Sequence, residues 1–133
     1  MSLGSKGEAM IKLYYSNRCQ SSTKACLWFK AHGLEVEKKK LDYLSRQDLM
    51  RLLALTDQGM AEILKHKGKV QTAEISNFLH SDLSFEEALY FLSTHSDWLR
   101  SPIILSENKY MVGYNHEEIR KFLPRDYRRM EVS

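Results

Sequence analysis

The order of strand-like and helix-like segments constrains the fold of this chain more than any other feature of its sequence. Residues 11–15 are rich in β-branched and aromatic side chains, which predicts a strand, and residues 20–32 place apolar side chains at helical spacing. Gly33 follows where a helix-ending glycine belongs, and residues 34–41 alternate apolar and charged side chains, which predicts a second strand at a sheet edge. The N-terminal part therefore predicts a strand–helix–strand unit.

A strand–strand–helix unit is predicted at the other end of the sequence. Residues 102–105 are typical of a buried strand, 106–109 of a hairpin turn, and 110–112 of the antiparallel partner strand. A capping box that begins at Asn115 predicts a short helix, which Pro124 ends.

The segment between these two units predicts helices and no strand. Ser45 begins a capping sequence before an apolar run, Thr56 starts a further expected helix, and residues 70–79 are weakly helical or irregular. A capping box at Ser84 precedes another helix. Residues 45–98 are therefore expected to be all-helical.

Together these segments predict an α/β fold of the thioredoxin-like type, with a mixed sheet in βαβ…ββα order and an inserted helical lobe. The thioredoxin-like lobe would comprise 10–44 and 99–125, and the helical insert about 45–98, within a single domain over 10–133. Residues 1–9 are small and polar without periodicity, and we expect an added or flexible leader there.

Composition excludes several classes of function. The 133 residues carry 20 basic and 17 acidic side chains, and the net charge of +3 is too small to indicate a nucleic-acid-coating protein. No run of about 18 apolar residues predicts a membrane span, and no apolar N-terminal stretch predicts a signal peptide. Two cysteines exclude a disulfide-rich scaffold and a four-cysteine zinc site. Free thiols without an export signal predict a cytoplasmic location and no membrane partner.

We expect neither a metal nor a cofactor. The five histidines show no ligand-like spacing to cysteine or carboxylate residues. No Gly-rich phosphate-binding loop is present, so nucleotide binding is not supported.

Cys19 is the strongest candidate for chemistry, because it follows the first predicted strand and directly precedes the first helix. A thiol at that position faces unpaired backbone N–H groups and the positive end of the helix dipole, both of which lower its pKa. A small, inert residue in a tight turn is the alternative interpretation. The fold also predicts a structural cis-proline at Pro102, beside the same loop.

Ser22 occupies the position of the second thiol in a Cys-x-x-Cys redox loop, so this loop cannot form a disulfide. The other thiol, Cys26, lies seven residues beyond Cys19, or roughly 10 Å along a helix, whereas a disulfide needs Cα atoms within about 7 Å. We therefore expect Cys26 to be a structural or partly exposed helix residue.

Three stretches, 13–25, 99–104 and 112–125, resemble the ArsC/Spx family, and the last is most similar to its Spx branch. The resemblance runs in order over about 10–129. It implies a thioredoxin-like domain with a helical insert, in agreement with the order of the predicted elements. It also implies one of two functions, because the family contains arsenate reductases and Spx-type transcriptional regulators.

The reductase branch uses a cysteine at the position of Cys19 as its nucleophile, and arginines hold the arsenate oxyanion. In this sequence Ser101 replaces the arginine before the cis-proline, and Lys67 corresponds to the arginine of the helical lobe. Arg100 is adjacent but is expected to point to the other face of an extended segment. A reductase of this type, with glutathione as reductant, stays the alternative function, since glutaredoxin-linked members also have Cys-x-x-Ser.

Spx-type regulators bind the C-terminal domain of the bacterial RNA polymerase α subunit through a surface that contains a glycine. The stretch 55–64 resembles that region, and its glycine is Gly59. A glycine inside a helix lowers stability by about 1 kcal/mol relative to alanine. The close approach of a partner would explain why a glycine is present there. A cap or break between two short helices is the alternative explanation of Gly59.

The resemblance therefore implies a stress-related, Spx-like regulator that lacks the two-cysteine switch. Its activity would be set by its abundance or by a mixed disulfide of the loop cysteine. Arg100, Arg120 and Arg125 are secondary candidates for contacts with the partner or with promoter DNA in the complex. The unbound protein is expected to be a monomer.

Overall fold

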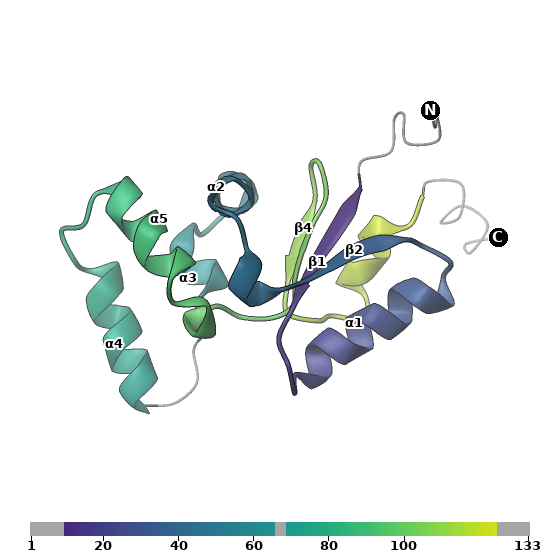
Figure 1. Cartoon of the computed structure of the whole chain (residues 1–133), viewed down its shortest axis with the longest axis horizontal. Helices are drawn as coiled ribbons and strands as arrows, with labels where there is room; N and C mark the ends of the chain where they lie inside the picture. Colours follow the sequence, from purple (N-terminus) through teal and green to yellow (C-terminus); the bar gives the residue numbers. More distant parts are fainter. Residues whose placement is uncertain (1–9, 66–68, 125–133) are drawn as a thin grey trace.

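A four-stranded mixed sheet forms the centre of the molecule (Figure 1). The computed structural model describes residues 10–65 and 69–124. Strand β1 (Ile11–Tyr15) pairs in parallel with β2 (Val36–Lys40) and antiparallel with β3 (Ile103–Leu105). Strand β4 (Tyr110–Val112) pairs antiparallel with β3, giving the order β2-β1-β3-β4. The predicted strand–helix–strand and strand–strand units are thus confirmed.

Helix α1 (Gln20–Ala31) and the 3₁₀ helix η4 (Glu118–Phe122) pack against one face of the sheet. The helix ends at its C-cap His32, and Gly33 follows with a φ of +66°, as expected for a left-handed residue after a helix. The core between these helices and the sheet consists of Leu13, Ala25, Phe29, Ile104, Met111, Ile119 and Phe122.

The helical insert packs against the opposite face of the sheet (Figure 1). Its elements are η2 (Leu41–Tyr43), α2 (Arg46–Leu55), α3 (Met60–Ile63), α4 (Lys69–Leu79), α5 (Phe85–Ser93) and η3 (Ser96–Trp98). Tyr14, Ile103 and Leu105 of the sheet share one buried cluster with Leu52 and Leu89 of the insert. Burial of this cluster fixes the insert on the sheet, because buried apolar surface is the main stabilising term in folding.

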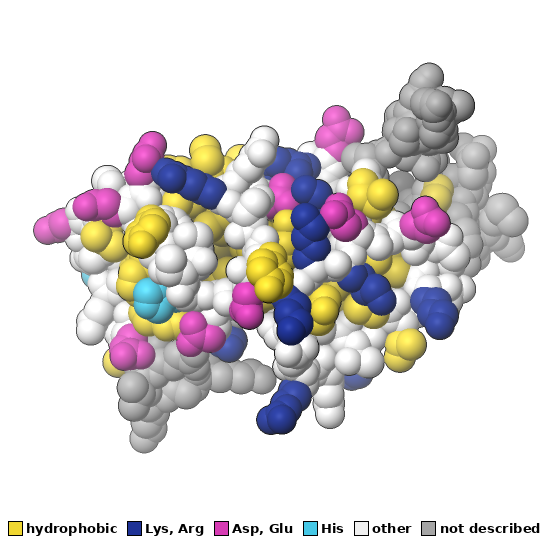
Figure 2. Space-filling view, in the orientation of Figure 1, with side chains coloured by type: hydrophobic (Ala, Val, Ile, Leu, Met, Phe, Trp, Pro, Cys, Tyr) yellow, Lys and Arg dark blue, Asp and Glu magenta, His cyan; other side chains and the backbone are white. Residues whose placement is uncertain are grey.

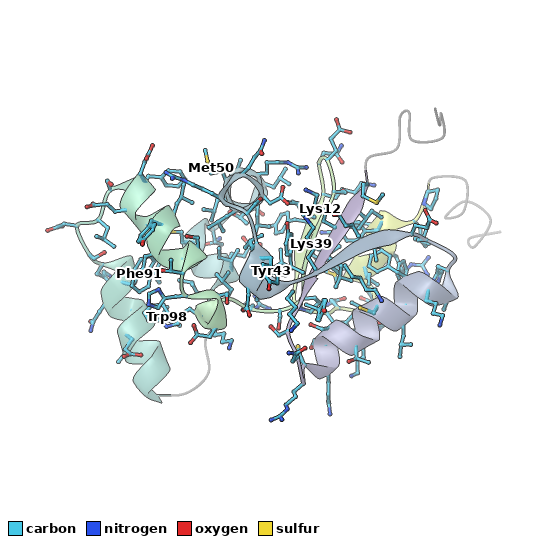
Figure 3. All side chains as sticks on the ribbon, viewed as in Figure 1. Lys12, Lys39, Tyr43, Met50, Phe91 and Trp98 are labelled. Atoms are coloured by element: carbon cyan, nitrogen blue, oxygen red, sulfur yellow. The ribbon has the colours of Figure 1, made fainter. Side chains whose placement is uncertain are left out.

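A buried carboxylate also joins the insert to the sheet. Asp48, on α2, accepts hydrogen bonds from the Tyr14 hydroxyl at 2.6 Å and from Lys12 Nζ at 2.9 Å, both on β1. Arg51 Nη1 donates to its other oxygen at 3.1 Å, and Arg51 Nη2 donates to the Ser106 carbonyl beyond β3 at 3.0 Å. Figure 3 labels Lys12 beside β1. Three segments distant in the sequence therefore meet at one charged group.

Several predicted helix details are corrected by the structure. Thr56 does not start a helix, because it is the C-cap of α2, and the next helix, α3, is only four residues long. Residues 69–79 form a regular helix, α4, where the sequence pattern was weak. The capping box at Ser84 is confirmed, with its hydroxyl and the Glu87 carboxylate bonded to each other's backbone N–H.

The last helix is a 3₁₀ helix with half of the expected capping box. Asn115 Oδ1 accepts from the backbone N–H groups of Glu117 and Glu118, both at 2.8 Å. The other half would be a hydrogen bond from the Asn115 N–H to the Glu118 carboxylate. That carboxylate pairs instead with Lys121 at 2.8 Å. In the described part of the chain, no helix is long and apolar enough to cross a membrane.

Candidate functional site

The loop between β1 and α1 presents Cys19 at the start of the helix. Arg18 adopts a left-handed conformation with a φ of +58°, which few non-glycine residues do, and Cys19 is then extended as the N-cap of α1. The Cys19 sulfur accepts a hydrogen bond from the Ser22 N–H at 3.4 Å. The thiol therefore takes the capping role that an oxygen usually fills, and it lies at the positive end of a 12-residue helix.

The strand-entry segment before β3 completes this site. The Ser101–Pro102 peptide bond is cis, as predicted, and Ser101 Oγ lies 3.2 Å from the Cys19 sulfur. Burial alone would raise the pKa of the Cys19 thiol, but hydrogen bonds with Ser101 and Ser22 outweigh burial and hold this pKa below its ordinary value. Cys19 is half-buried and forms no disulfide, so its thiol is partly accessible from solvent.

Ser22 has a structural task in place of a redox one. Its side chain is buried, and its hydroxyl oxygen accepts a hydrogen bond from the Ser16 N–H at 3.2 Å, which closes the loop onto the end of β1. Cys26 is partly buried and packs against the core cluster between α1 and the sheet. Burial raises the pKa of the Cys26 thiol, against a smaller opposing effect of Lys38, so the pKa values of the two free cysteines shift in opposite directions.

A cleft of about 380 Å³ opens beside the thiol and is lined by Arg18, Cys19, Gln20, Thr23 and Lys24. Its two cations are suited to attract an anion. However, the position before the cis-proline offers only a hydroxyl, and the Arg100 guanidinium bonds to the Glu62 carbonyl at 3.1 Å. Lys67, the other expected anion-binding position, lies outside the described residues. Within the described segments, no three His, Cys, Asp or Glu side chains form a metal-binding group.

Gly59 lies at the start of α3, not inside a helix as the sequence argument assumed. It is the N-cap residue, with φ +67° and ψ −141°, a conformation that glycine adopts far more readily than other residues. The cap explanation is therefore correct for the backbone. A Cβ atom built on Gly59 would meet nothing within 4 Å, so the surface above this turn is open.

Glu62 organises the turn at Gly59, a role that the sequence analysis missed. Its carboxylate accepts hydrogen bonds from the Gln58 N–H at 3.1 Å and from the Tyr110 hydroxyl of β4. The bond with Tyr110 is the main reason that the pKa of Glu62 lies below its usual value, whereas burial and then the carboxylate raise the pKa of Tyr110 to about 12. Only the position of Glu62 three residues after Gly59 could have signalled this contact.

Arg100 lies in the segment that connects the two candidate regions. Its backbone N–H donates to the Ile63 carbonyl at 2.9 Å, next to α3, and it directly precedes the Ser101 that contacts Cys19. Gly113, with φ +83°, gives the Arg100 side chain room, because a Cβ there would lie 3.0 Å from Nη2. Arg100 is thus tied to the Gly59 turn through α3.

The structure does not bring the other predicted arginine to this surface. Arg120 is exposed on η4, which packs with α1 on the sheet face opposite the insert. Arg125 lies outside the described residues. The candidate site therefore consists of the Cys19 loop and the Gly59 turn, joined by the segment before β3.

Comparison with known proteins gives these two regions a context. The sequence model of the ArsC family matches residues 14–122, which include both of them. This chain belongs to the ArsC family. Two of its ArsC-family relatives are named global transcriptional regulator Spx. The relative from Streptococcus mutans is 34% identical over 126 residues, covering 92% of this chain and 90% of the relative. The relative from Lactiplantibacillus plantarum is 34% identical over 125 residues, covering 92% and 93%.

Solved structures of ArsC-related proteins have the same fold. An ArsC family related protein from Bacteroides fragilis aligns with a TM-score of 0.70 at 20% identity, covering 84% of this chain and 96% of that protein. An arsenate reductase from Vibrio cholerae aligns with a TM-score of 0.63 at 17% identity, covering 86% and 96%. At these identities the likeness concerns the fold, so the predicted thioredoxin-like architecture with its helical insert is confirmed.

Proposed function

We propose that this protein is a Spx-like transcriptional regulator that binds the C-terminal domain of the RNA polymerase α subunit through the turn at Gly59. The observation that carries the proposal is the similarity to proteins named global transcriptional regulator Spx along 92% of the chain. The open turn at Gly59 supports the place of the contact, because its lack of a side chain allows a partner's backbone to approach closely.

The turn is also held in one conformation before any partner binds. Gln58 and Gly59 are fixed by Glu62, through its side chain and through the Glu62 N–H, which donates to the Gly59 carbonyl at 3.1 Å. A pre-organised surface loses less conformational entropy on binding, which favours affinity. The exposed Asp57 and Gln58 beside it offer polar groups to a partner.

Regulation without a loop disulfide follows from Ser22. Only one thiol is present in the Cys-x-x-Ser loop, so an oxidant cannot close an intramolecular bridge there. The level of the protein, or a mixed disulfide between Cys19 and a small thiol, would then set its activity. Promoter DNA would contribute through phosphate contacts in the assembled complex.

An arsenate reductase activity is the second candidate, and the environment of Cys19 favours it. The lowered pKa of this thiol and the cations Arg18 and Lys24 beside it suit attack on an oxyanion, with glutathione supplying the electrons. The hydroxyl of Ser101 stands where a forked guanidinium would bind the oxyanion, and a hydroxyl is the weaker anion ligand. The regulator therefore remains our principal proposal.

A calorimetric titration of the reduced protein with the isolated α-subunit domain tests the proposal. We expect saturable binding at micromolar concentration or tighter, with the largest amide shifts in a parallel ¹⁵N NMR titration at 57–62. The same titration after diamide treatment should give an unchanged affinity, because no loop disulfide can form. No binding at high concentration would refute the proposal. Arsenate turnover with glutathione, absent in Cys19→Ser, would then support the reductase.

A further inference from the structure

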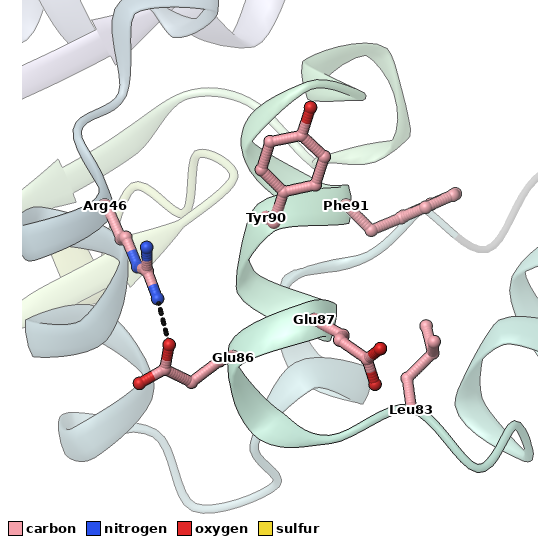
Figure 4. Close-up of a pocket in the computed structure, with 6 residues that line it drawn as sticks. All are labelled: Arg46, Leu83, Glu86, Glu87, Tyr90 and Phe91. Carbon is pink, nitrogen blue, oxygen red and sulfur yellow. Dashed lines mark hydrogen bonds and ion pairs between the residues drawn. The ribbon is translucent and has the colours of Figure 1, made fainter.

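Helix α5 presents an apolar surface that neither the Gly59 turn nor the Cys19 loop uses. Leu83, Phe85 and Tyr90 keep 42%, 53% and 67% of their surface exposed, although they lie within eight residues of each other. A groove of about 470 Å³ runs along this helix (Figure 4) and is lined by Arg46, Leu83, Glu86, Glu87, Tyr90 and Phe91. Large apolar side chains gathered on a surface indicate an interaction site.

Aromatic contacts hold Phe91, one of the residues that line this α5 groove. The Phe91 ring stacks on Phe78 of α4 with a centroid separation of 4.8 Å and on His95 with a separation of 3.9 Å. Trp98 packs edge-on against the same ring at 5.0 Å, and Figure 3 shows Phe91 and Trp98 together at this end of the molecule. A partner that binds here meets a surface that is already ordered, which lowers the entropic cost of association.

The charge around the α5 groove is acidic. Glu86 and Glu87 line the groove and are exposed, and the exposed Asp82 directly precedes the lining residue Leu83 in the sequence. The single cation among the lining residues, Arg46, pairs with Glu86 at 2.8 Å. The sequence of the whole insert, 45–98, contains eight acidic and five basic residues, in a chain whose net charge is +3. In Figure 2 most Lys and Arg side chains lie away from this end of the molecule, where Asp and Glu prevail.

Local helix chemistry explains only part of this pattern. Glu87 caps α5, and acidic residues in a first turn stabilise the helix dipole. Neither effect requires Leu83, Phe85 and Tyr90 to be apolar and exposed. Apolar anchors surrounded by carboxylates are complementary to a segment that carries apolar side chains on one face and Lys or Arg on the other.

We infer that the α5 groove docks a basic amphipathic helix of a protein partner. Its apolar side chains contact Leu83, Tyr90 and Phe91, and its cations face the lining carboxylates Glu86 and Glu87. This surface shares no residue with the Gly59 turn or with the Cys19 loop. The inference does not depend on the proposed function.

Fluorescence anisotropy with two labelled 16-residue helical peptides tests the inference. One peptide carries Leu at amphipathic spacing with Lys on the polar face, and the other carries Glu in place of Lys. We expect the Lys peptide to saturate the protein at micromolar concentration, with at least tenfold weaker binding of the Glu peptide. Because the contact is partly ionic, 300 mM salt should weaken it several-fold.

Two variants locate the binding site. Leu83→Gln combined with Tyr90→Gln should weaken binding of the Lys peptide at least tenfold, and circular dichroism checks that the fold is kept. Tyr43→Gln is the matched control, since Tyr43 is 72% exposed on η2 and does not line the groove. Failure of the Lys peptide to saturate, equal binding of both peptides, or equal effects of the two variants would overturn the inference.

Discussion

Replacing Asp48 with asparagine should destabilise the protein strongly, although the two side chains have the same size. The Asp48 carboxylate is only 4% exposed and accepts hydrogen bonds from Tyr14, Lys12 and Arg51. An asparagine amide would turn one N–H₂ group toward these donors and would leave two cations without their counter-charge. The perturbation therefore acts on the contact that joins α2 to β1.

The size of the expected loss in stability depends on how exposed to solvent the two cations that contact Asp48 are. Removal of one partner from a buried ion pair typically costs about 3–5 kcal/mol. The Lys12 and Arg51 side chains are 29% and 39% exposed, so both cations can recover part of their hydration. We therefore expect the free energy of unfolding to fall by about 2–3 kcal/mol for Asp48→Asn, which lies within the range of about 1.5–3 kcal/mol found for hydrogen bonds to charged groups.

Urea unfolding followed by circular dichroism at pH 7 measures this loss, with Glu86→Gln as the control. Glu86 pairs with Arg46 but is 81% exposed, so its loss should cost less than about 1 kcal/mol. A fall of less than 1 kcal/mol for Asp48→Asn, or equal effects of both variants, would refute the view that this carboxylate holds the insert on the sheet.

The pH dependence of the same variant provides an independent check. Burial would raise the pKa of Asp48, but hydrogen bonds from Tyr14 and Lys12 outweigh burial and leave this pKa below the ordinary value. The stabilisation is then present above the unfolded-state pKa of about 4 and is lost as the pH falls through the lower folded-state pKa. The wild-type advantage over Asp48→Asn should shrink below pH 4, and a constant difference down to pH 2 would contradict the reasoning.

Two further predictions concern the candidate site. Tyr110→Phe removes one hydrogen bond to the Glu62 carboxylate, so we expect a loss of about 1 kcal/mol in urea unfolding and a shifted Gln58 amide resonance. An unmoved resonance would show that Tyr110 does not position the turn. Because their pKa values shift in opposite directions, Cys19 should react with iodoacetamide at pH 7 at least tenfold faster than Cys26, as measured by peptide mass spectrometry. Equal rates of the two thiols would be inconsistent with the hydrogen bonds assigned to Cys19.

Short sequence patterns predicted those elements whose formation depends on a few neighbouring residues. Apolar and β-branched runs, one alternating segment and a hairpin turn predicted the four strands of the described sheet. The capping residues Ser45 and Ser84 marked the starts of α2 and α5. The position of Cys19 before a helix and the cis bond before Pro102 were predicted for the same reason, because each depends on a few neighbouring residues and on the element order.

Contacts between distant segments could not be predicted in this way. The sequence predicts only that Ser45 begins a capping sequence, whereas the carboxylate of Asp48, three residues later, bonds to Lys12 and Tyr14 of β1, and no residue pattern near Asp48 indicates these partners. The bond between Glu62 and Tyr110 joins residues 48 positions apart. The helix expected from Thr56 was misplaced because apolar spacing continues through the turn, where the positive φ of Gly59 ends any helical path.

The most direct test of the proposed function compares two substitutions at Gly59 in calorimetric binding to the polymerase α-subunit domain. Alanine and arginine share the cost of the backbone conformation at φ +67° and ψ −141°, about 1–3 kcal/mol of stability, and a Cβ there meets no atom within 4 Å. They differ in the bulk and charge that they place on the open surface. We predict that Gly59→Ala binds within a few-fold of the wild type, whereas folded Gly59→Arg shows no saturable binding. Equal affinities of the two folded variants, or no binding by the wild type, would contradict the account.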